Sequence, residues 1–251
     1  MSATSTGAFR DDLFAGHVVL VTGGTSGIGA GIADAFAGSG AVVTVTGATL
    51  AEAEAARSQP GFRLRDAVAC DVRDDAAVRR LVGDLPRLDV LVNCAGVIRR
   101  DAEHDPDVFA DTVAINLTGT MRCCTHARPR LAAARGAIVN IASILSIFGG
   151  ARVPGYSASK GGVLQLTRSL AIAYADDGIR VNAIAPGWVR TALTQALQDD
   201  ADRSAAIVGR TPMRRWAEPA DVAGAALFLA SPAAAFVTGV LLPVDGGYHV
   251  S

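Results

Sequence analysis

The amino-acid sequence predicts a single-domain α/β fold: a doubly wound parallel sheet of about seven strands, flanked by helices on both faces. Three observations support this prediction. Short apolar runs alternate with helix-length, alanine-rich stretches along the whole chain. Several of these runs are almost entirely apolar, as expected of strands buried on both faces. Finally, 251 residues with 50% hydrophobic composition suit one large domain with a substantial core.

Seven segments have the length and composition of strands. They are residues 17–22, 41–46, 64–70, 89–92, 136–141, 180–184 and 239–243. Between them lie stretches typical of helices. These are residues 29–37, 74–84, 109–131, 158–174 and 219–229. A sheet built in this way binds ligands at the carboxyl ends of its strands, so the residues that follow each strand are the candidates for a functional site.

The chain shows no repeat, low-complexity block or linker, so we expect one domain over residues 13–251. Residues 1–12 lack the basic-then-apolar layout of a signal peptide and are expected to form a flexible tail. Residues 188–216 are rich in polar and small side chains between the sixth strand and the last helix. We expect this segment to form a lid over the site.

A glycine-rich turn joins the first predicted strand to the first predicted helix. It reads Thr22-Gly23-Gly24-Thr25-Ser26-Gly27-Ile28-Gly29. Glycines allow a tight turn and a close approach of the backbone to a pyrophosphate, and the helix N-terminus supplies free N–H groups. A plain turn is the alternative, but the position between a strand and a helix favours a dinucleotide site.

Further motifs follow in order along the chain. They are Asn93-Cys94-Ala95-Gly96, Ala114-Ile115-Asn116-Leu117, Tyr156-Ser157-Ala158-Ser159-Lys160, Pro186-Gly187 and Val244-Asp245-Gly246-Gly247. Together with the G-x-x-x-G-x-G loop, these motifs resemble the short-chain dehydrogenase/reductase family over nearly the whole chain, with Cys94 in place of the family's second asparagine. The resemblance implies a Rossmann-type fold and an NAD(P)-dependent enzyme that moves a hydride between nicotinamide and an alcohol or ketone carbon.

The catalytic group can be argued from the residues themselves. Tyr156 and Lys160 are four residues apart, hence on one face of a helix and within mutual reach. A nearby ammonium, helped by a cationic nicotinamide, is expected to lower the tyrosine pKa from its ordinary value near ~10, so that Tyr156 can accept or donate the alcohol proton. Ser143 ends another strand and can hydrogen-bond the substrate oxygen. The resemblance adds Asn116, which would hold a water that links Lys160 to solvent.

The resemblance also implies a set of cofactor-binding residues. The set comprises Gly23, Thr25, Ser26, Gly27, Ile28, Gly29, Gly47, Ala48, Asp71, Val72, Asn93, Ala95, Gly96, Tyr156, Lys160, Pro186, Gly187, Val189 and Thr191. Among them, Asp71 would accept from the adenine amino group, and the backbone near Gly187 and Val189, with the Thr191 hydroxyl, would orient the carboxamide.

The choice between NAD and NADP depends on the residues after the second strand. An acid there binds the ribose diol, whereas an arginine pairs with a 2′-phosphate. Gly47 and Ala48 provide neither marker, and the glycine loop lacks a basic residue. Because no cation would neutralise the extra phosphate, we expect NAD, with NADP not excluded.

Arginines near the expected active-site mouth suggest a carboxylated substrate. Arg99 and Arg100 follow the Asn93 motif, and Arg152 precedes Tyr156 by four residues. An arginine there could bind a carboxylate through paired hydrogen bonds. The surrounding sequence resembles the gluconate and 2-dehydro-3-deoxygluconate dehydrogenases of the family. The predicted substrate is therefore a sugar acid or keto-deoxy sugar acid, with Arg99, Arg152 and Trp188 as candidate ligands.

Three alternatives remain open from the sequence. A 3-oxoacyl thioester reductase would favour NADP and basic residues for a carrier phosphate. A polyol or simple secondary-alcohol dehydrogenase would need no carboxylate ligand. A catalytically inactive nucleotide-binding protein would share the fold without the reaction, although the complete Asn–Ser–Tyr–Lys set argues against it.

Composition limits the partners and the compartment. A formal net charge of −1 without long runs of one sign argues against nucleic acid or an anionic membrane as a partner. Four cysteines without metal-ligand spacing are interpreted as reduced thiols of a cytoplasmic protein, and the scattered histidines suggest no metal site. The resemblance implies a homo-oligomer, with a tetramer favoured.

Overall fold

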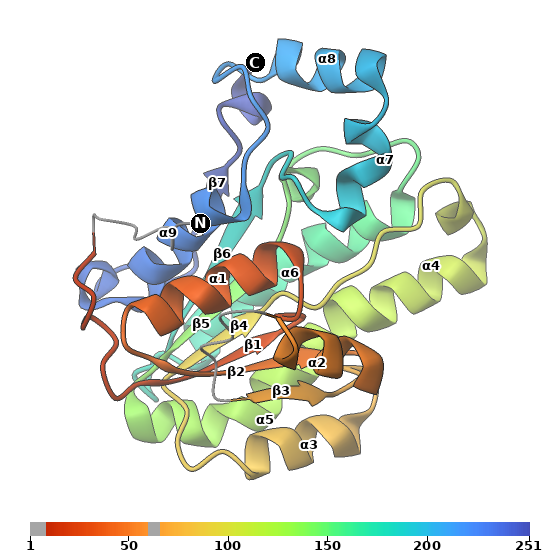
Figure 1. Cartoon of the computed structure of the whole chain (residues 1–251). Helices are drawn as coiled ribbons and strands as arrows, with labels where there is room; N and C mark the ends of the chain where they lie inside the picture. Colours follow the sequence, from red (N-terminus) through yellow and green to blue (C-terminus); the bar gives the residue numbers. More distant parts are fainter. Residues whose placement is uncertain (1–8, 60–65) are drawn as a thin grey trace.

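The computed structural model describes residues 9–59 and 66–251, which form one seven-stranded sheet with helices on both faces (Figure 1). Every strand pair is parallel, and the order is β3-β2-β1-β4-β5-β6-β7. The strands are β1 (Val18–Thr22), β2 (Val42–Gly47), β3 (Asp66–Ala69), β4 (Val90–Asn93), β5 (Ala137–Ile141), β6 (Arg180–Pro186) and β7 (Leu241–Val244). The predicted doubly wound parallel sheet is thus confirmed. Its strand order reverses between β1 and β4, which is where such sheets bind ligands.

Helices connect successive strands and cover the sheet. They are α1 (Gly27–Gly38), α2 (Leu50–Arg57), α3 (Asp75–Gly83), α4 (Pro106–Val113), α5 (Gly119–Ala134), α6 (Pro154–Ala173), α7 (Gln195–Gln198), α8 (Ala201–Arg210) and α9 (Pro219–Ala230). All seven predicted strands form, within two residues at each described end. For the third, residues 64 and 65 lie outside the described residues.

Two apolar clusters lie on opposite faces of the sheet. Ile32 and Phe36 of α1 pack with Leu227 of α9 on one face. Leu131 of α5 packs with residues of α3 and α6 on the other, and each of these four side chains is fully buried. Burial on both faces explains why the strands read as continuous apolar runs rather than alternating ones.

The predicted helix over 109–131 is interrupted. A π-helical turn over Ala114–Thr118 separates α4 from α5. Such a turn shifts the helical register by one residue, and π-turns frequently lie at functional sites. Here the turn contains Asn116, whose side chain is fully buried.

The segment predicted as a lid contains α7 and α8, which lie beyond the carboxyl ends of the strands (Figure 1). Its inner side has a small apolar cluster in which Trp216 packs against Leu197 and Ile207. Of the predicted tail, residues 1–8 lie outside the described residues, whereas Phe9 packs against the α1–α9 core.

Two searches over the described residues bear on partners. No helix there has the length and apolar character required to span a membrane. Likewise, residues 9–59 and 66–251 contain no cluster of three histidine, cysteine or acidic side chains that could hold a metal ion. Cys70, Cys94, Cys123 and Cys124 are free thiols.

Candidate active site

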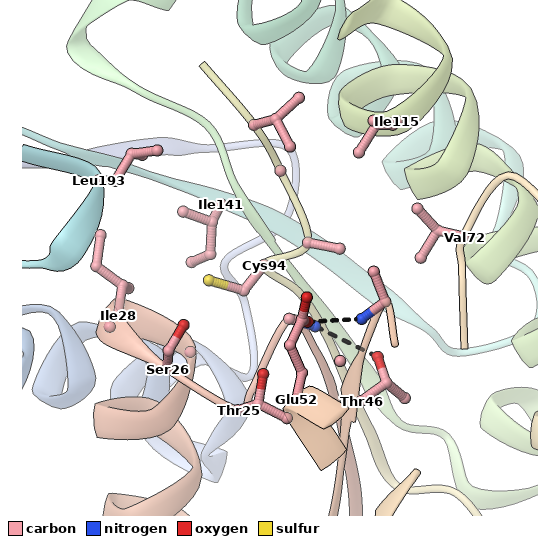
Figure 2. A pocket seen from close by; sticks show the side chains of 18 of the residues that line it. Thr25, Ser26, Ile28, Thr46, Glu52, Val72, Cys94, Ile115, Ile141 and Leu193 are labelled. Atoms are coloured by element: carbon pink, nitrogen blue, oxygen red, sulfur yellow. Dashed lines mark hydrogen bonds between the residues drawn. The ribbon is translucent and has the colours of Figure 1, made fainter. Parts of the chain in front are cut away.

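A cleft of about 420 Å³ opens at the carboxyl ends of the central strands, between the glycine loop and the turn after β4 (Figure 2). Most residues predicted to bind the cofactor line it. These are Gly23, Thr25, Ser26, Gly27, Ile28, Gly29, Gly47, Ala48, Asp71, Val72, Ala95, Gly96, Tyr156, Lys160 and Thr191. Residues of β2, of α6 and of the turns that follow β1 and β4 therefore come together at the point where strand order reverses.

The glycine loop has the geometry of a phosphate cradle. Gly23 has φ +64°, and a Cβ there would lie 2.7 Å from the backbone of Ala95. At Gly29 a Cβ would lie 2.2 Å from the carbonyl oxygen of Gly23. Ser26, the residue that precedes α1, makes no side-chain capping hydrogen bond, so the helix N-terminus keeps N–H groups for an anion. The residues present thus fit the pyrophosphate of a dinucleotide.

Four residues expected in this cleft lie elsewhere. Pro186, Gly187 and Val189 line an adjoining cavity instead. The expectation that Asn93 lines the cofactor cleft is corrected. Its side-chain amide instead donates to Asn140 Oδ1 at 2.8 Å and to Cys124 Sγ at 3.3 Å, in the protein interior. Successive side chains of a strand point to opposite faces, and Asn93 faces the core rather than the cleft.

The adjoining cavity, of about 410 Å³, meets the cleft at Tyr156. Both cavities are lined by Tyr156 together with Ile28, Ile141, Thr191 and Leu193. Ser143 lines only the adjoining cavity, from the end of β5. A small molecule seated there would have its reacting carbon between Ser143, Tyr156 and the cleft.

Burial dominates the electrostatics of Tyr156. It raises the pKa of the phenol to about 12, while a hydrogen bond with Ser143 acts in the opposite direction. The expected lowering of the tyrosine pKa by Lys160 together with a cationic nicotinamide stays a prediction for the cofactor-bound enzyme, whereas burial in the protein itself acts in the opposite direction. Lys160 Nζ lies 5.6 Å from the centroid of the Tyr156 ring, and burial remains the largest influence on the phenol.

Lys160 is held by the backbone of β5. Its Nζ donates to the carbonyl oxygen of Ile141 at 2.6 Å, and its side chain is only 4% exposed. Burial lowers the pKa of Lys160 to about 8, because the charged form loses hydration. The buried pair therefore contains a lysine that can change protonation near neutral pH.

Asn116 fixes the segment between β4 and Arg99. Its Oδ1 accepts from Val97 N at 2.8 Å, and its Nδ2 donates to Val97 O at 2.9 Å and to Ser159 Oγ at 3.0 Å. Gly96 lies between Asn116 and Lys160, since a Cβ there would be 3.2 Å from Asn116 Oδ1 and 3.6 Å from Lys160 Nζ. The π-turn thus brings Asn116 beside the lysine.

Glu103 is a site residue that the sequence did not reveal. It is 1% exposed, and its carboxylate accepts from Tyr156 N and Arg99 N, each at 2.7 Å. The two hydrogen bonds attach the start of α6 to the loop after β4. In the sequence, Glu103 lies in a stretch of charged residues that is typical of an exposed surface, so nothing there indicated that its side chain is buried and holds Tyr156.

The arginines are arranged differently from the sequence-based prediction. Arg99 points away from the cavity and pairs with Asp111 at 2.7 Å. Arg152 lines the cavity but forms an ion pair with Asp101. Arg100 also lines it, is partly desolvated, and has no carboxylate partner within residues 9–59 and 66–251. Of these three arginines, Arg100 is therefore the one that lines the cavity without an acidic partner in the described chain.

A second arginine at this cavity comes from α8. Arg210 stacks over the ring of Tyr248 at 4.2 Å and donates to its hydroxyl at 3.3 Å. Trp188 lines the same cavity, and its buried Nε1 lacks a hydrogen-bond partner in the described chain. Among the described residues, no acidic side chain lines this cavity, so it favours an anionic molecule with a hydrogen-bond acceptor.

The fold and the paired cavities define a nicotinamide-dependent oxidoreductase with a serine, a tyrosine and a lysine at its reacting centre. Comparison with known proteins agrees. Residues 23–249 match the family model described as Enoyl-(Acyl carrier protein) reductase. The chain is 42% identical over 249 residues to 2-dehydro-3-deoxy-D-gluconate 5-dehydrogenase from Pseudoalteromonas atlantica, covering 93% of this chain and 96% of that protein.

Two further proteins are similar to this chain over nearly its whole length. Cis-4-hydroxycyclohexanecarboxylate dehydrogenase from Sinomonas cyclohexanicum is 44% identical over 251 residues, covering 94% of this chain and 98% of that protein. A solved structure from Beutenbergia cavernae, described as an NAD(P)-dependent gluconate 5-dehydrogenase with NADP at low occupancy, superposes with a TM-score of 0.88 at 40% identity. It covers 96% of this chain and 100% of that one. The chain belongs to the short-chain dehydrogenase/reductase family and is an oxidoreductase of CH–OH groups.

Proposed function

We propose that this enzyme is an NAD-dependent dehydrogenase of carboxylated secondary alcohols, with a sugar acid or keto-deoxy sugar acid as substrate. The observation that carries the proposal is the arginine-lined cavity that meets the dinucleotide cleft at Tyr156. Arg100 and Arg210 face this cavity without an acidic partner in the described chain. Two guanidinium groups in the same cavity as Ser143 match a substrate that has both a carboxylate and a hydroxyl.

The protein's own residues perform the proton chemistry. In oxidation, Tyr156 as phenolate accepts the proton from the substrate hydroxyl, and Ser143 donates a hydrogen bond to the same oxygen. A bound nicotinamide supplies the acceptor for the hydride that leaves the carbon. Lys160 stabilises the phenolate and exchanges protons with solvent beside Asn116. In reduction the proton returns from Tyr156 to the ketone oxygen.

The names of the two curated relatives support the substrate class. One acts on a linear deoxy sugar acid and the other on a cyclohexane ring with one hydroxyl. These molecules share a carboxylate and a secondary alcohol or ketone but not a polyol chain. A carboxylate is therefore the group that both named substrates share, and Arg100 is the candidate that would bind it in this chain.

The remaining expectations form part of the same proposal. Residues 13–251 act as one catalytic domain, and residues 188–216 close over the substrate because Trp188 and Leu197 line the cavity from this segment.

We propose a cytoplasmic homotetramer. Two exposed apolar side chains, Ile172 of α6 and Phe236 near the C-terminus, support association with other copies of the chain.

A substrate panel tests the proposal. Purified enzyme with NAD is mixed in turn with gluconate, with 2-dehydro-3-deoxygluconate and with uncharged polyols of matched length. In a separate reaction, the enzyme with NADH is mixed with a 3-oxoacyl thioester. The absorbance of reduced nicotinamide is followed in every reaction. Turnover of the acids with at least about tenfold higher kcat/KM than the polyols supports it. Equal turnover of acids and polyols, or activity confined to the thioester, contradicts it.

A further inference from the structure

One acidic side chain in the dinucleotide cleft comes from an unexpected element. Glu52 lies in the first turn of α2, five residues beyond Gly47 at the end of β2. It nevertheless lines the cleft, and Figure 2 labels it among the cleft-lining residues together with Thr25 and Thr46. The end of β2 is where an acid binds the adenosine ribose in dinucleotide folds. Gly47 cannot supply that acid, but Glu52 occupies the same place.

Gly47 makes room for this arrangement. A Cβ at Gly47 would lie 2.7 Å from the Cβ of Glu52 and 2.8 Å from its Oε2, closer than real side chains approach. It would also lie 3.1 Å from Cγ2 of Thr25. The glycine at the end of β2 thus leaves free the space that the side chain of Glu52 occupies from α2.

Hydrogen bonds fix the position of Glu52 and leave one of its two carboxylate oxygens available to a ligand. Its Oε2 accepts from Ala48 N at 2.8 Å, and its own backbone N–H donates to Thr49 Oγ1 at 3.2 Å. Within the described chain Oε1 makes no hydrogen bond, and the residue as a whole is exposed. A carboxylate held by one oxygen can accept from a ribose diol with the other.

The surrounding charges reinforce the effect of Glu52. Among the described lining residues the cations are Arg73 and Lys160, and Arg73 is paired with Asp71 at 2.6 Å and with Asp111 at 2.8 Å. Lys160 lies at the opposite end, beside Tyr156. No unpaired cation among the described lining residues is thus left to neutralise a phosphate on the adenosine ribose.

We infer that Glu52 is the residue that selects NAD over NADP, by accepting from the ribose diol and repelling a 2′-phosphate. This inference rests on the proposed nicotinamide site but not on the proposed sugar-acid substrate. It places the acid that specifies NAD on α2 rather than at the end of β2.

The test compares the binding of NADH and NADPH to the whole protein by isothermal titration calorimetry, without substrate. Glu52→Gln keeps an acceptor for Ala48 N but removes the charge. The wild type should bind NADH at least about tenfold more tightly than NADPH, and Glu52→Gln should shrink this preference by roughly tenfold or more. Because the repulsion is electrostatic, the wild-type preference should also shrink at high salt.

Glu54→Gln provides the matched control, since Glu54 is exposed on the same helix but does not line the cleft. It should leave both affinities unchanged. If Glu52 served only to cap α2, Glu52→Gln would change both affinities by the same factor or not at all, which would overturn the inference. Tighter binding of NADPH by the wild type would also overturn it. Failure of both nucleotides to bind would refute the cofactor site and the role of Glu52 with it, whereas lack of sugar-acid turnover would leave the binding result standing.

Discussion

At the scale of single residues, the substrate cavity shows how neighbours in sequence take different roles. Arg99 and Arg100 are adjacent, yet one pairs with Asp111 outside the cavity and the other faces its interior. Arg152 faces the interior but is paired with Asp101. The sequence could predict that arginines gather at the active-site mouth. It could not predict which one lacks a partner, because this depends on acids that are distant along the chain.

We therefore expect Arg100→Ala to reduce kcat/KM for a carboxylated substrate by roughly 10- to 100-fold, the worth of one charge-assisted hydrogen-bonded pair of about 1.5–3 kcal/mol. The loss should appear mainly in KM, because the carboxylate is remote from the reacting carbon. Steady-state kinetics on an acid and on its uncharged analogue provide the measurement.

Arg152→Ala is the control, since Arg152 is already neutralised by Asp101. It should change kcat/KM by a few-fold at most. An equal loss for the acid and the uncharged analogue in Arg100→Ala would show that Arg100 supports the fold of the site rather than the carboxylate.

The buried Tyr156–Lys160 pair predicts a pH dependence. Burial raises the pKa of Tyr156 to about 12 and lowers that of Lys160 to about 8, so Lys160 loses its proton first, near pH 8, and can then take the proton of Tyr156 to leave the phenolate. Oxidation needs a proton acceptor, so kcat/KM should rise with pH through about 8 and level roughly one to two pH units above that value. Reduction needs the proton and should fall over the same range. The pH profile of Lys160→Met should lack this inflection, and a flat wild-type profile from pH 6 to 9 would refute the assignment.

At the scale of elements, the strands were more predictable than the connections. A strand buried on both faces is marked by its own apolar residues, and all seven appear where expected. Helix α2 was not predicted, because its alanines and glutamates show little contrast between faces. The π-turn at Ala114–Thr118 was missed as well, since a one-residue change of register leaves no compositional mark. Both missed elements matter for the site, because α2 positions Glu52 and the π-turn positions Asn116.

Glu103 connects two elements, the loop after β4 and the N-terminus of α6. Glu103→Ala leaves two part-buried backbone N–H groups without their acceptor, and each such group costs about 1–3 kcal/mol where water cannot replace the carboxylate. We expect a loss of stability of about 2–5 kcal/mol in urea unfolding. We also expect a lower kcat, since Tyr156 N is one of the two donors.

Asp107→Ala, on exposed α4, is the comparison for this experiment because its side chain makes no hydrogen bond or ion pair in the described chain. It should alter the free energy of unfolding by less than about 0.5 kcal/mol. Equal stability of Glu103→Ala and the wild type would mean that water replaces the carboxylate, and that Glu103 does not position the tyrosine.

At the scale of the whole molecule, function arises where two cavities meet. The parallel sheet and its reversal of order bring the ends of β1, β4 and β5 together with the start of α6, which places Tyr156 between a nucleotide cleft and an arginine-lined cavity. The order of motifs along the chain was enough to predict this convergence. The identity of the groups that face each cavity was not, as Asn93, Arg99 and Glu52 show.

The most direct test of this account is Tyr156→Phe, which removes one hydroxyl where the two cavities meet. NADH affinity by calorimetry should be unchanged within about threefold, while kcat for the sugar acid should fall by about 10²–10⁴-fold, the contribution of a positioned acid or base. This pairing of retained binding with lost turnover would establish Tyr156 as the proton carrier of the reaction. Turnover at the wild-type rate in Tyr156→Phe would contradict the central claim.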